Sequence, residues 1–424
     1  MKRLDAYPSR RDVMLGGGVA AAAAFAAPAL AQAAPQVVVI GGGYAGATCA
    51  RFLQREGVNV TLVEPNATYV SCPFSNAVLA GLRDMGQQTF TYDAIAAQGV
   101  RIARQAATKI DRDAKRVTLA DGTTLAYDRL VLAPGIDMNF TALPGYDQAA
   151  SDILPHAWKA GAQTLLLRQQ LEAMADGGTV VISAPANPFR CPPGPYERAS
   201  LIAWYLKTNK PKSKLIILDA KDSFSKQGLF TAAWKEIYGD MIEWVGLSGG
   251  GKVIEVKAAE KIFVTEFGEH RADVGNVIPP QRAGRIAIDA GIADQTGWCP
   301  IDPVTFEARA QAGVHVIGDA AVAGGMPKSA FAANAQAKAC AQAVALMLRG
   351  AQAPEPKLIN TCYSLVKPDY GISVAGVYSP AKGLLTDVPG AGGVSPAKAP
   401  DTVRAAEASY AEGWYKTITA EVFG

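Results

Sequence analysis

Short, continuous apolar runs recur along the chain, and each is bounded by glycine, proline or polar residues of the kinds that form turns. Runs of this length are typical of buried strands in a parallel sheet. The runs that predict strands are residues 37–40, 60–63, 127–133, 179–184, 215–218, 274–278 and 314–317. Helical segments lie between several of them, so the pattern predicts an α/β fold.

The stretch from Val37 to Glu64 has every part of a βαβ dinucleotide-binding unit, in order. Gly41 permits the tight turn after the first strand, Gly43 lets the backbone approach a pyrophosphate, and Gly46 allows close helix packing. The helix that follows offers unpaired N–H groups to an anion. Glu64 ends the second strand, where a carboxylate can accept a ribose hydroxyl. This stretch therefore predicts a bound dinucleotide.

A second βαβ unit is predicted from strands at Thr179–Ala184 and Leu215–Leu218 with a helix over 196–207. The loop at 184–197, where a nicotinamide site would have its glycines, contains five prolines instead. Proline has no N–H and stiffens the turn, so this loop is poorly suited to hold a pyrophosphate. We therefore expect that the second unit has lost its nicotinamide site.

The later elements predict a return to the first unit and then a separate C-terminal part. The strand at 314–317 ends in Gly318-Asp319, which places a carboxylate where it can bind a ribityl hydroxyl. A hairpin is expected at 116–127, a helix at 329–349, a strand at 372–378 and a short helical piece around Trp414. The predicted architecture is two Rossmann-like folds plus an α+β interface domain. Its parts are 34–150 and 275–350 (the first fold), 151–274 (the second) and 351–424 (the interface domain).

The first 33 residues have the pattern of an export signal. Ser9-Arg10-Arg11 precedes an Ala- and Gly-rich apolar stretch, and A-x-A cleavage sequences occur at 29–31 and 31–33. The paired arginines favour the twin-arginine route, which carries folded proteins, and so predict a bacterial periplasmic location. Pro28 and the glycines at 16–18 argue against a stable membrane anchor, and a permanent N-terminal anchor is the alternative. In an oxidising compartment the six cysteines are candidates for disulfides.

Composition and charge exclude several other functions. The formal net charge is +3, and the first 33 residues carry four basic and two acidic residues, so no nucleic-acid surface is implied. The sequence has no C-x-x-C-H, so we expect no covalent haem on this chain, and its three histidines are too scattered to suggest a metal site. Cys49 and Cys340 lie in predicted helices among apolar neighbours, where cysteine usually acts as a small buried hydrophobe. Cys299 is likewise expected to be structural.

Taken together, the chain resembles the flavoprotein subunit of flavocytochrome c sulfide dehydrogenase, within the glutathione-reductase-like flavoprotein superfamily. The resemblance covers nearly all of the chain beyond the predicted signal, and the run at 189–200, FRCPPGPYERAS, is its most specific part. The other matching segments are 41–46, 71–72, 154–161, 278–284, 316–320, 326–329 and 361–364.

The resemblance implies a periplasmic enzyme that oxidises sulfide and passes electrons through FAD to a separate c-type cytochrome, which forms a heterodimer with it and carries the haem. Cys72 falls where the family bonds the flavin covalently through an 8α-S-cysteinyl link. Cys191 and Cys362 match the redox-active disulfide, and Glu197 matches an active-site carboxylate. Trp414 matches an aromatic residue near the flavin.

Several alternatives remain open at this stage. Six cysteines allow many pairings, so sequence alone does not fix a bond between Cys191 and Cys362, which would otherwise be an ordinary stabilising disulfide. Glu197 begins a predicted helix, where a carboxylate also interacts favourably with the helix dipole. The rival functions are a sulfide:quinone reductase, which predicts an amphipathic, membrane-seeking C-terminus, and a non-catalytic flavoprotein carrier for sulfur oxidation.

Overall fold

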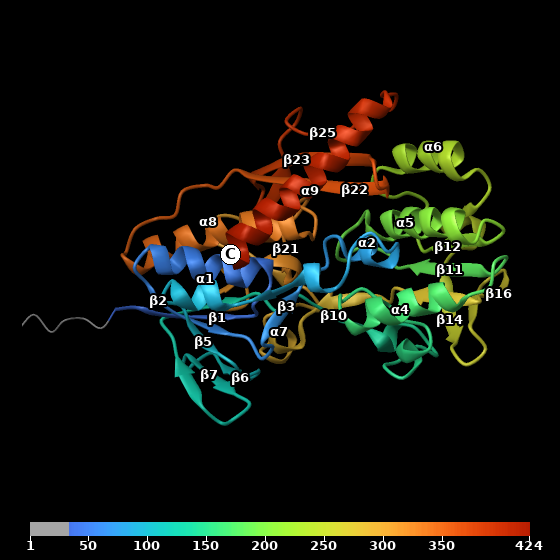
Figure 1. Cartoon of the computed structure of the whole chain (residues 1–424). Coiled ribbons are helices and arrows are strands. Elements are labelled where there is room, and N and C mark those ends of the chain that lie inside the picture. The colour runs from blue at the N-terminus through green and yellow to red at the C-terminus, as the bar shows by residue number, and fades with distance from the viewer. Residues whose placement is uncertain (1–33) are drawn as a thin grey trace, which may run out of the picture. The chain divides into compact units, whose positions relative to one another are not determined.

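The predicted apolar runs form two parallel sheets in the computed structural model, which describes residues 34–424 (Figure 1). The strands of the first sheet lie in the order β20-β9-β1-β2-β5, and every neighbouring pair is parallel. These strands are β1 (Gln36–Ile40), β2 (Asn59–Val63), β5 (Arg101–Ala103), β9 (Arg129–Leu132) and β20 (Val314–Val316). The distant run at 314–317 is therefore confirmed as part of the same sheet as β1.

Helices α1 (Tyr44–Arg55) and α8 (Ala330–Leu348) pack against each other beside this sheet. Helix α1 crosses from β1 to β2. Cys49 in α1 and Cys340 in α8 are both fully buried at 0% exposure. The prediction that they are small buried side chains within helices is therefore confirmed.

The second sheet has the order β13-β12-β11-β17, and it too is entirely parallel. Its strands are β11 (Thr179–Ala184), β12 (Lys214–Asp219), β13 (Ile242–Val245) and β17 (Val274–Val277). The run at 274–278 is expected where the chain returns to the first fold, but as β17 it pairs with β11 in this second sheet. The helices of this region are α4 (Ala162–Ala173), α5 (Gly194–Asn209) and α6 (Gln227–Tyr238). The predicted strand at 179–184 is confirmed without a change of bounds, and α5 begins two residues before the predicted helix.

The C-terminal region differs from its prediction in extent. The short helical piece around Trp414 is in fact α9 (Asp401–Phe423), a helix of 23 residues. The segment at 361–364 lies inside β22 (Leu358–Lys367), which pairs antiparallel with β23 (Tyr370–Ala381). This sheet is completed by β24 (Leu384–Asp387) and β25 (Gly393–Val394).

The remaining strands and helices form small sheets and connections around these layers. The predicted hairpin at 116–127 is confirmed as β7 (Arg116–Leu119) and β8 (Thr124–Ala126). The other strands are β3 (Thr68–Val70), β4 (Thr89–Thr91), β6 (Ala107–Asp111), β10 (Ile136–Met138), β14 (Val253–Lys257), β15 (Ile262–Thr265), β16 (Gly268–Arg271), β18 (Gln281–Ala283), β19 (Cys299–Pro300) and β21 (Ala321–Val322). The other helices are α2 (Ser75–Leu79), α3 (Asp93–Ala97) and α7 (Arg285–Asp289).

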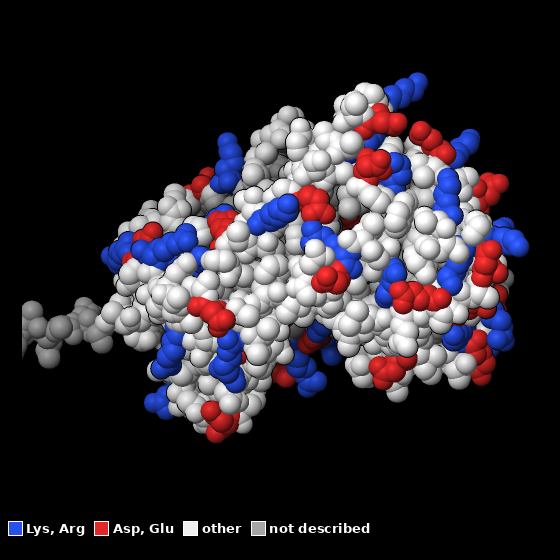
Figure 2. Space-filling view, in the orientation of Figure 1, with Lys and Arg blue, Asp and Glu red and all other residues white. Residues whose placement is uncertain are grey.

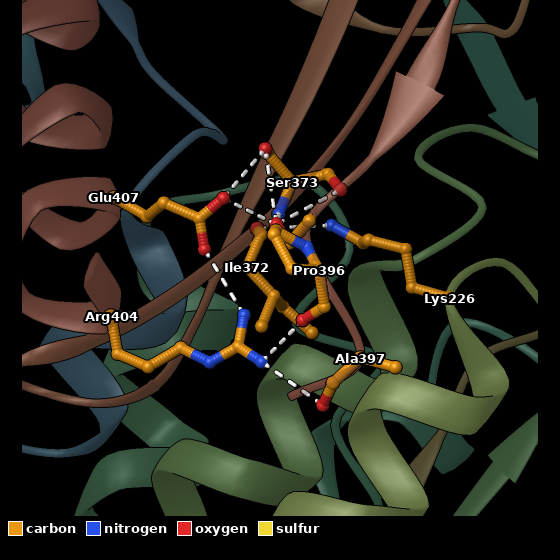
Figure 3. A network of polar contacts seen from close by, with 8 residues as sticks. Lys226, Ile372, Ser373, Pro396, Ala397, Arg404 and Glu407 are labelled. Carbon is orange, nitrogen blue, oxygen red and sulfur yellow. Dashed lines mark hydrogen bonds and ion pairs between the residues drawn. The ribbon is translucent and has the colours of Figure 1, made fainter. Parts of the chain in front are cut away.

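A buried polar network fixes the start of α9 (Figure 3). Arg404 is only 2% exposed, and it donates to the Glu407 carboxylate at 3.3 Å and to the Pro396 carbonyl at 2.7 Å. The same carboxylate accepts from the hydroxyls of Ser373 in β23 and Ser395. These charge-assisted hydrogen bonds tie α9 to the sheet and so set the position of Trp414 further along the helix.

The C-terminal end of α9 packs against β3 and β4 through aromatic rings. Phe423 stacks against Tyr69 at 5.0 Å between ring centroids and against Phe90 at 5.2 Å. The apolar side chains at this end of the helix, Ile418, Val422 and Phe423, are therefore buried against the chain itself. None of the helices within residues 34–424 combines the length and apolar character needed to cross a bilayer.

Residues 35–424 form one compact unit, and the domain boundaries near 150, 274 and 350 stay predictions. The predicted export signal at 1–33 lies outside the described residues. Acidic and basic side chains are interspersed over the face in view in Figure 2, which agrees with the small net charge.

Candidate functional site

One cavity of about 670 Å³ collects nearly all of the candidate residues. It lies where the glycine turn after β1, the segment after β3, the loop before α5, the end of β20, the strand β22 and helix α9 meet. The candidate residues that line it are Gly41, Gly43, Glu64, Cys72, Cys191, Glu197, Asp319, Cys362 and Trp414. The fold thus brings together residues that are up to 373 positions apart, counted from Gly41 to Trp414.

The three glycines of the turn have different roles in the structure. Gly41 has a φ of +102°, which glycine adopts readily. A Cβ on Gly46 would lie 1.8 Å from the Gly41 carbonyl oxygen, so Gly46 permits the close packing of α1 on the turn. A Cβ on Gly43 would meet only the Tyr69 ring, at 3.4 Å. The chain's own atoms therefore leave space at Gly43, as expected if a ligand approaches the backbone there.

Glu64 stands directly after β2 and beside the glycine turn. One carboxylate oxygen accepts from the Gly42 N–H at 2.8 Å, and the other accepts from the Asn66 N–H at 2.9 Å. The Asn66 side-chain amide donates to that second oxygen as well, at 2.7 Å. These bonds fix the carboxylate at the cavity wall, and the oxygen bound to Gly42 retains a lone pair for a further donor.

Asp319 follows β20, and its side chain is half-buried, with the oxygen Oδ1 fully buried. Its Oδ1 has no hydrogen-bond partner among the described residues, while Oδ2 lies 3.8 Å from the Arg190 guanidinium. Burial raises the pKa of Asp319, and Arg190 and Lys328 act in the opposite direction. A buried carboxylate oxygen without a partner is costly, so its presence at the cavity points to a ligand hydroxyl.

Cys72 lies on the turn between β3 and α2 and is half-buried in the cavity wall. Its Sγ is 3.7 Å from the Trp158 carbonyl oxygen. Phe74, two residues later, has a φ of +66°, an unusual conformation for a residue with a side chain.

Cys191 and Cys362 face the same cavity from the loop before α5 and from β22. All six cysteines are free in the structure, so the pairing of these two stays a prediction. Cys191 has a φ of +57°, and Gly194 leaves room for its sulfur, since a Cβ there would lie 3.1 Å from Sγ. Strained backbone of this kind clusters at functional sites. Burial raises the pKa of both thiols.

Glu197 lies in the first turn of α5, where it also interacts favourably with the helix dipole. Its two oxygens accept from the Leu365 N–H at 2.9 Å and from the Asn76 side-chain amide at 2.8 Å. Burial raises the pKa of Glu197, although both of these bonds favour its ionised form. The carboxyl group is thus held rigidly beside the two cysteines.

Trp414 reaches the cavity from α9. It stacks on Phe331 with ring centroids 6.0 Å apart and an 8° angle between the planes, and it contacts Tyr363 in β22. The aromatic residue expected near the flavin therefore lines the cavity, on a much longer helix than predicted.

Sequence reasoning assigned no role to the buried cations of this site. Arg198 in α5 is 2% exposed and donates to Asn76 Oδ1 and Asn276 Oδ1, each at 3.0 Å. Lys226, at the start of α6, lies beside Cys362 and is 9% exposed. Both residues are charged in an otherwise ordinary helical context, and no local pattern marks them as buried. Within residues 34–424, no cluster of side chains suited to a metal ion is found.

Two regions of the chain match models of a single family. Residues 164–279 match the central part of the sulfide dehydrogenase (flavocytochrome c) flavoprotein chain, and residues 354–423 match the flavin-binding part of flavocytochrome c sulphide dehydrogenase. A relative from Chlorobaculum thiosulfatiphilum, a sulfide dehydrogenase (flavocytochrome c) flavoprotein chain, is 53% identical over 45 residues, which are 10% of this chain and 94% of the relative. The chain belongs to the flavocytochrome c sulfide dehydrogenase flavoprotein family.

The wider fold of this flavoprotein family is also clear. Residues 35–172 match the pyridine nucleotide-disulphide oxidoreductase model. The sulfide:quinone oxidoreductase of Aquifex aeolicus has a similar structure, with a TM-score of 0.69, 19% identity and 92% of each chain covered. The ferredoxin reductase component of a chlorobenzene dioxygenase from Cupriavidus is 25% identical over 76% of this chain and 77% of that protein. The predicted α/β class with a dinucleotide-binding fold is therefore confirmed.

The cavity of this flavoprotein fits FAD. The glycine turn leaves room for a pyrophosphate at Gly43, and Asp319 Oδ1 and the buried Tyr92 hydroxyl lack protein partners among the described residues. A dinucleotide carries both the phosphates and the hydroxyl groups that these atoms require. The residues present thus match the cofactor that the family models indicate.

Proposed function

We propose that this chain is the periplasmic flavoprotein subunit of a sulfide dehydrogenase, which oxidises sulfide with FAD and delivers the electrons to a separate c-type cytochrome. The observation that supports it best is the convergence of the glycine turn, Cys72 and the pair Cys191 and Cys362 on one cavity. The periplasmic location rests on the twin-arginine pattern of residues 1–33.

In this proposal FAD supplies the ability to exchange either one or two electrons. The turn at Gly41 and Gly43 would hold its pyrophosphate, and Glu64 and Asp319 would bind its hydroxyl groups. Cys191 and Cys362, joined as a disulfide, would accept the attack of hydrosulfide by thiol–disulfide exchange. Glu197, fixed by two donors, would hold a proton or a negative charge beside the opening disulfide.

The second βαβ unit supports an enzyme that does not use a nicotinamide cofactor. Asp219 ends β12, the position that Glu64 occupies after β2, and it is 0% exposed. Its carboxylate accepts from the Tyr196 hydroxyl at 2.6 Å and from the Trp244 indole at 3.0 Å, and it pairs with Lys221 at 2.6 Å. A buried carboxylate that is occupied by these three partners cannot bind the ribose of a nicotinamide cofactor. The electrons would then come from sulfide and not from such a cofactor.

The structure of α9 favours a cytochrome acceptor over a membrane quinone. A quinone reductase needs an apolar surface that inserts into the bilayer. The large apolar residues near the end of α9, including Ile418, Val422 and Phe423, are buried against the chain itself. The set of Cys191, Cys362 and Glu197 in one cavity speaks against a carrier without catalytic activity.

The proposal predicts that the chain co-purified with its c-type cytochrome reduces that haem when sulfide is added. The haem α-band absorbance reports the reduction directly. A matched sample with ubiquinone instead of cytochrome is expected to show no quinone reduction. Haem that stays oxidised with native protein, or rapid reduction of the quinone, would contradict the proposed acceptor.

A covalent bond between Cys72 and FAD makes a separate prediction. Native protein precipitated with acid is expected to keep its flavin in the pellet, and Cys72→Ser is expected to release it to the supernatant. The substitution removes only the sulfur nucleophile, so the variant still binds FAD before precipitation. Flavin absorbance in the two fractions is the measurement, and flavin already free in native supernatant would exclude the covalent link.

A further inference from the structure

Lys226 carries a buried ammonium group that lies beside the backbone of Cys362. Its Nζ donates to the Cys362 carbonyl oxygen at 2.8 Å and to the Ser364 hydroxyl at 2.8 Å, and it lies 3.5 Å from the Ile372 carbonyl oxygen. Figure 3 shows the side chain extending from the residue directly before α6 toward β23. Lys226 itself has a φ of +62° at the cap of α6, so its backbone is held in an unusual conformation.

Among the described residues, no carboxylate forms an ion pair with this ammonium group. Within residues 34–424 no ion pair involves Lys226, whereas the other lysine of the same loop, Lys221, pairs with Asp219 at 2.6 Å. An unpaired buried charge is unfavourable, and burial accordingly lowers the pKa of Lys226 to about 8. The acidic groups whose negative charge would stabilise it are Cys362, Glu197, Cys191 and Glu407. Cys362 acts most strongly among them, so a thiolate on Cys362 would supply the counter-charge that no ion pair provides.

The two sulfurs of the site have different surroundings. Asn360 donates its side-chain amide to Cys362 Sγ at 3.3 Å, and the Ser329 hydroxyl holds that amide in place through a 2.6 Å bond to Asn360 Oδ1. Cys362 is 9% exposed, while Cys191 is more accessible from the cavity. Thus Cys362 has an N–H donor at its sulfur and the Lys226 ammonium group at its backbone carbonyl to stabilise a negative charge. Arg190 also favours a negative charge on Cys191, but among the described residues no N–H donor to Cys191 Sγ is found, and Cys191 is the more exposed of the two cysteines.

We propose that Lys226 is a positioning residue that, with Asn360, makes Cys362 the sulfur that leaves as a thiolate, so that hydrosulfide attacks Cys191. This inference rests on the proposed sulfide oxidation. In the step, a bond forms between the hydrosulfide sulfur and Cys191 Sγ while the Cys191–Cys362 bond breaks. The electron pair of the broken bond leaves on Cys362 Sγ, and the hydrosulfide keeps its proton as the terminal S–H of a persulfide on Cys191. The sulfide is oxidised and the disulfide is reduced. A thiolate that is better stabilised leaves faster.

The site of attack can be measured on native holoenzyme without any substitution. The oxidised protein is mixed anaerobically with one equivalent of sulfide, its free thiols are alkylated at once, and its peptides are analysed by mass spectrometry. The proposal expects the additional sulfur on the Cys191 peptide and a plain alkyl group on Cys362. An additional sulfur on the Cys362 peptide would overturn it.

The role of the Lys226 charge is tested by Lys226→Gln, which removes the charge and keeps a hydrogen-bond donor. The equilibrium between disulfide and dithiol is titrated with dithiothreitol buffers and read by alkylation of Cys191 and Cys362. We expect reduction to become about tenfold less favourable, equivalent to about 30 mV for a two-electron couple. Ser364→Ala, which removes a hydrogen bond to Lys226 but no charge, is expected to leave the equilibrium within about twofold of native.

The outcomes separate this inference from the proposed function. Native protein whose flavin does not respond to sulfide would refute the proposed function. A native protein that does respond, together with an unchanged equilibrium in Lys226→Gln, would refute the role of Lys226 alone. Equal shifts in Lys226→Gln and Ser364→Ala would also refute it, since they would show that packing and not charge is responsible.

Discussion

Cys191→Ser is expected to abolish the bleaching of the bound flavin by sulfide while leaving FAD in place. The substitution removes one sulfur of the proposed disulfide, so hydrosulfide has no bond to open. The loss should be about 10³-fold or more in the rate of flavin reduction, the order of effect seen when a nucleophilic unit is disabled. FAD should stay bound, since the glycine turn and Asp319 lie on other segments of the cavity.

The measurement is a stopped-flow record of flavin absorbance after anaerobic mixing with sulfide. Cys340→Ala is a suitable control, because Cys340 is also buried but lies in α8 and not among the residues that line the cavity. It is expected to bleach at close to the native rate. Bleaching retained in Cys191→Ser would remove the disulfide from the mechanism.

Gly46→Ala is expected to destabilise the folded protein strongly. The new Cβ would lie 1.8 Å from the Gly41 carbonyl oxygen and 3.2 Å from the Ala133 Cβ, and the first of these is backbone that cannot rotate away. Overpacking in a tight core costs about 1–3 kcal/mol, and a clash with backbone costs more. Against a total stability of about 5–15 kcal/mol, such a loss should lower the melting temperature strongly.

Gly43→Ala provides the matched control for this prediction. Its Cβ would meet only the Tyr69 ring, at ordinary contact distance, so the protein without cofactor should melt close to the native temperature. The same methyl group would stand where the backbone approaches the pyrophosphate, so FAD content should fall. Thermal unfolding and flavin content are the two measurements. A Gly46→Ala variant as stable as native would show that the turn is not packed as described.

The sequence predicted the parts of the fold in which a local pattern and the tertiary structure agree. The strand at 179–184 is buried along nearly its whole length, so its apolar run alone determines its bounds. The length of helix α9 was underestimated because its buried residues are small or polar as often as they are large and apolar. Ala408, Ala411 and Thr419 are among them, and they give little apolar periodicity.

The same reasoning explains which site residues could be found. Gly41, Gly43, Gly46 and Glu64 occur at fixed spacing within one βαβ unit, so sequence alone identifies them. Lys226 and Asn360 lie 134 positions apart on unrelated elements, and both contact Cys362 because α6 packs against β22. Their burial comes from tertiary contacts, and a charged residue at the start of a helix is usually exposed.

The most direct test of the central claim is an anaerobic titration of the native chain with sulfide, followed through the flavin spectrum with and without an oxidised c-type cytochrome. We predict that sulfide bleaches the flavin in proportion to the amount added, and that the cytochrome restores the flavin spectrum as its haem becomes reduced. A flavin that stays oxidised in excess sulfide would contradict the account.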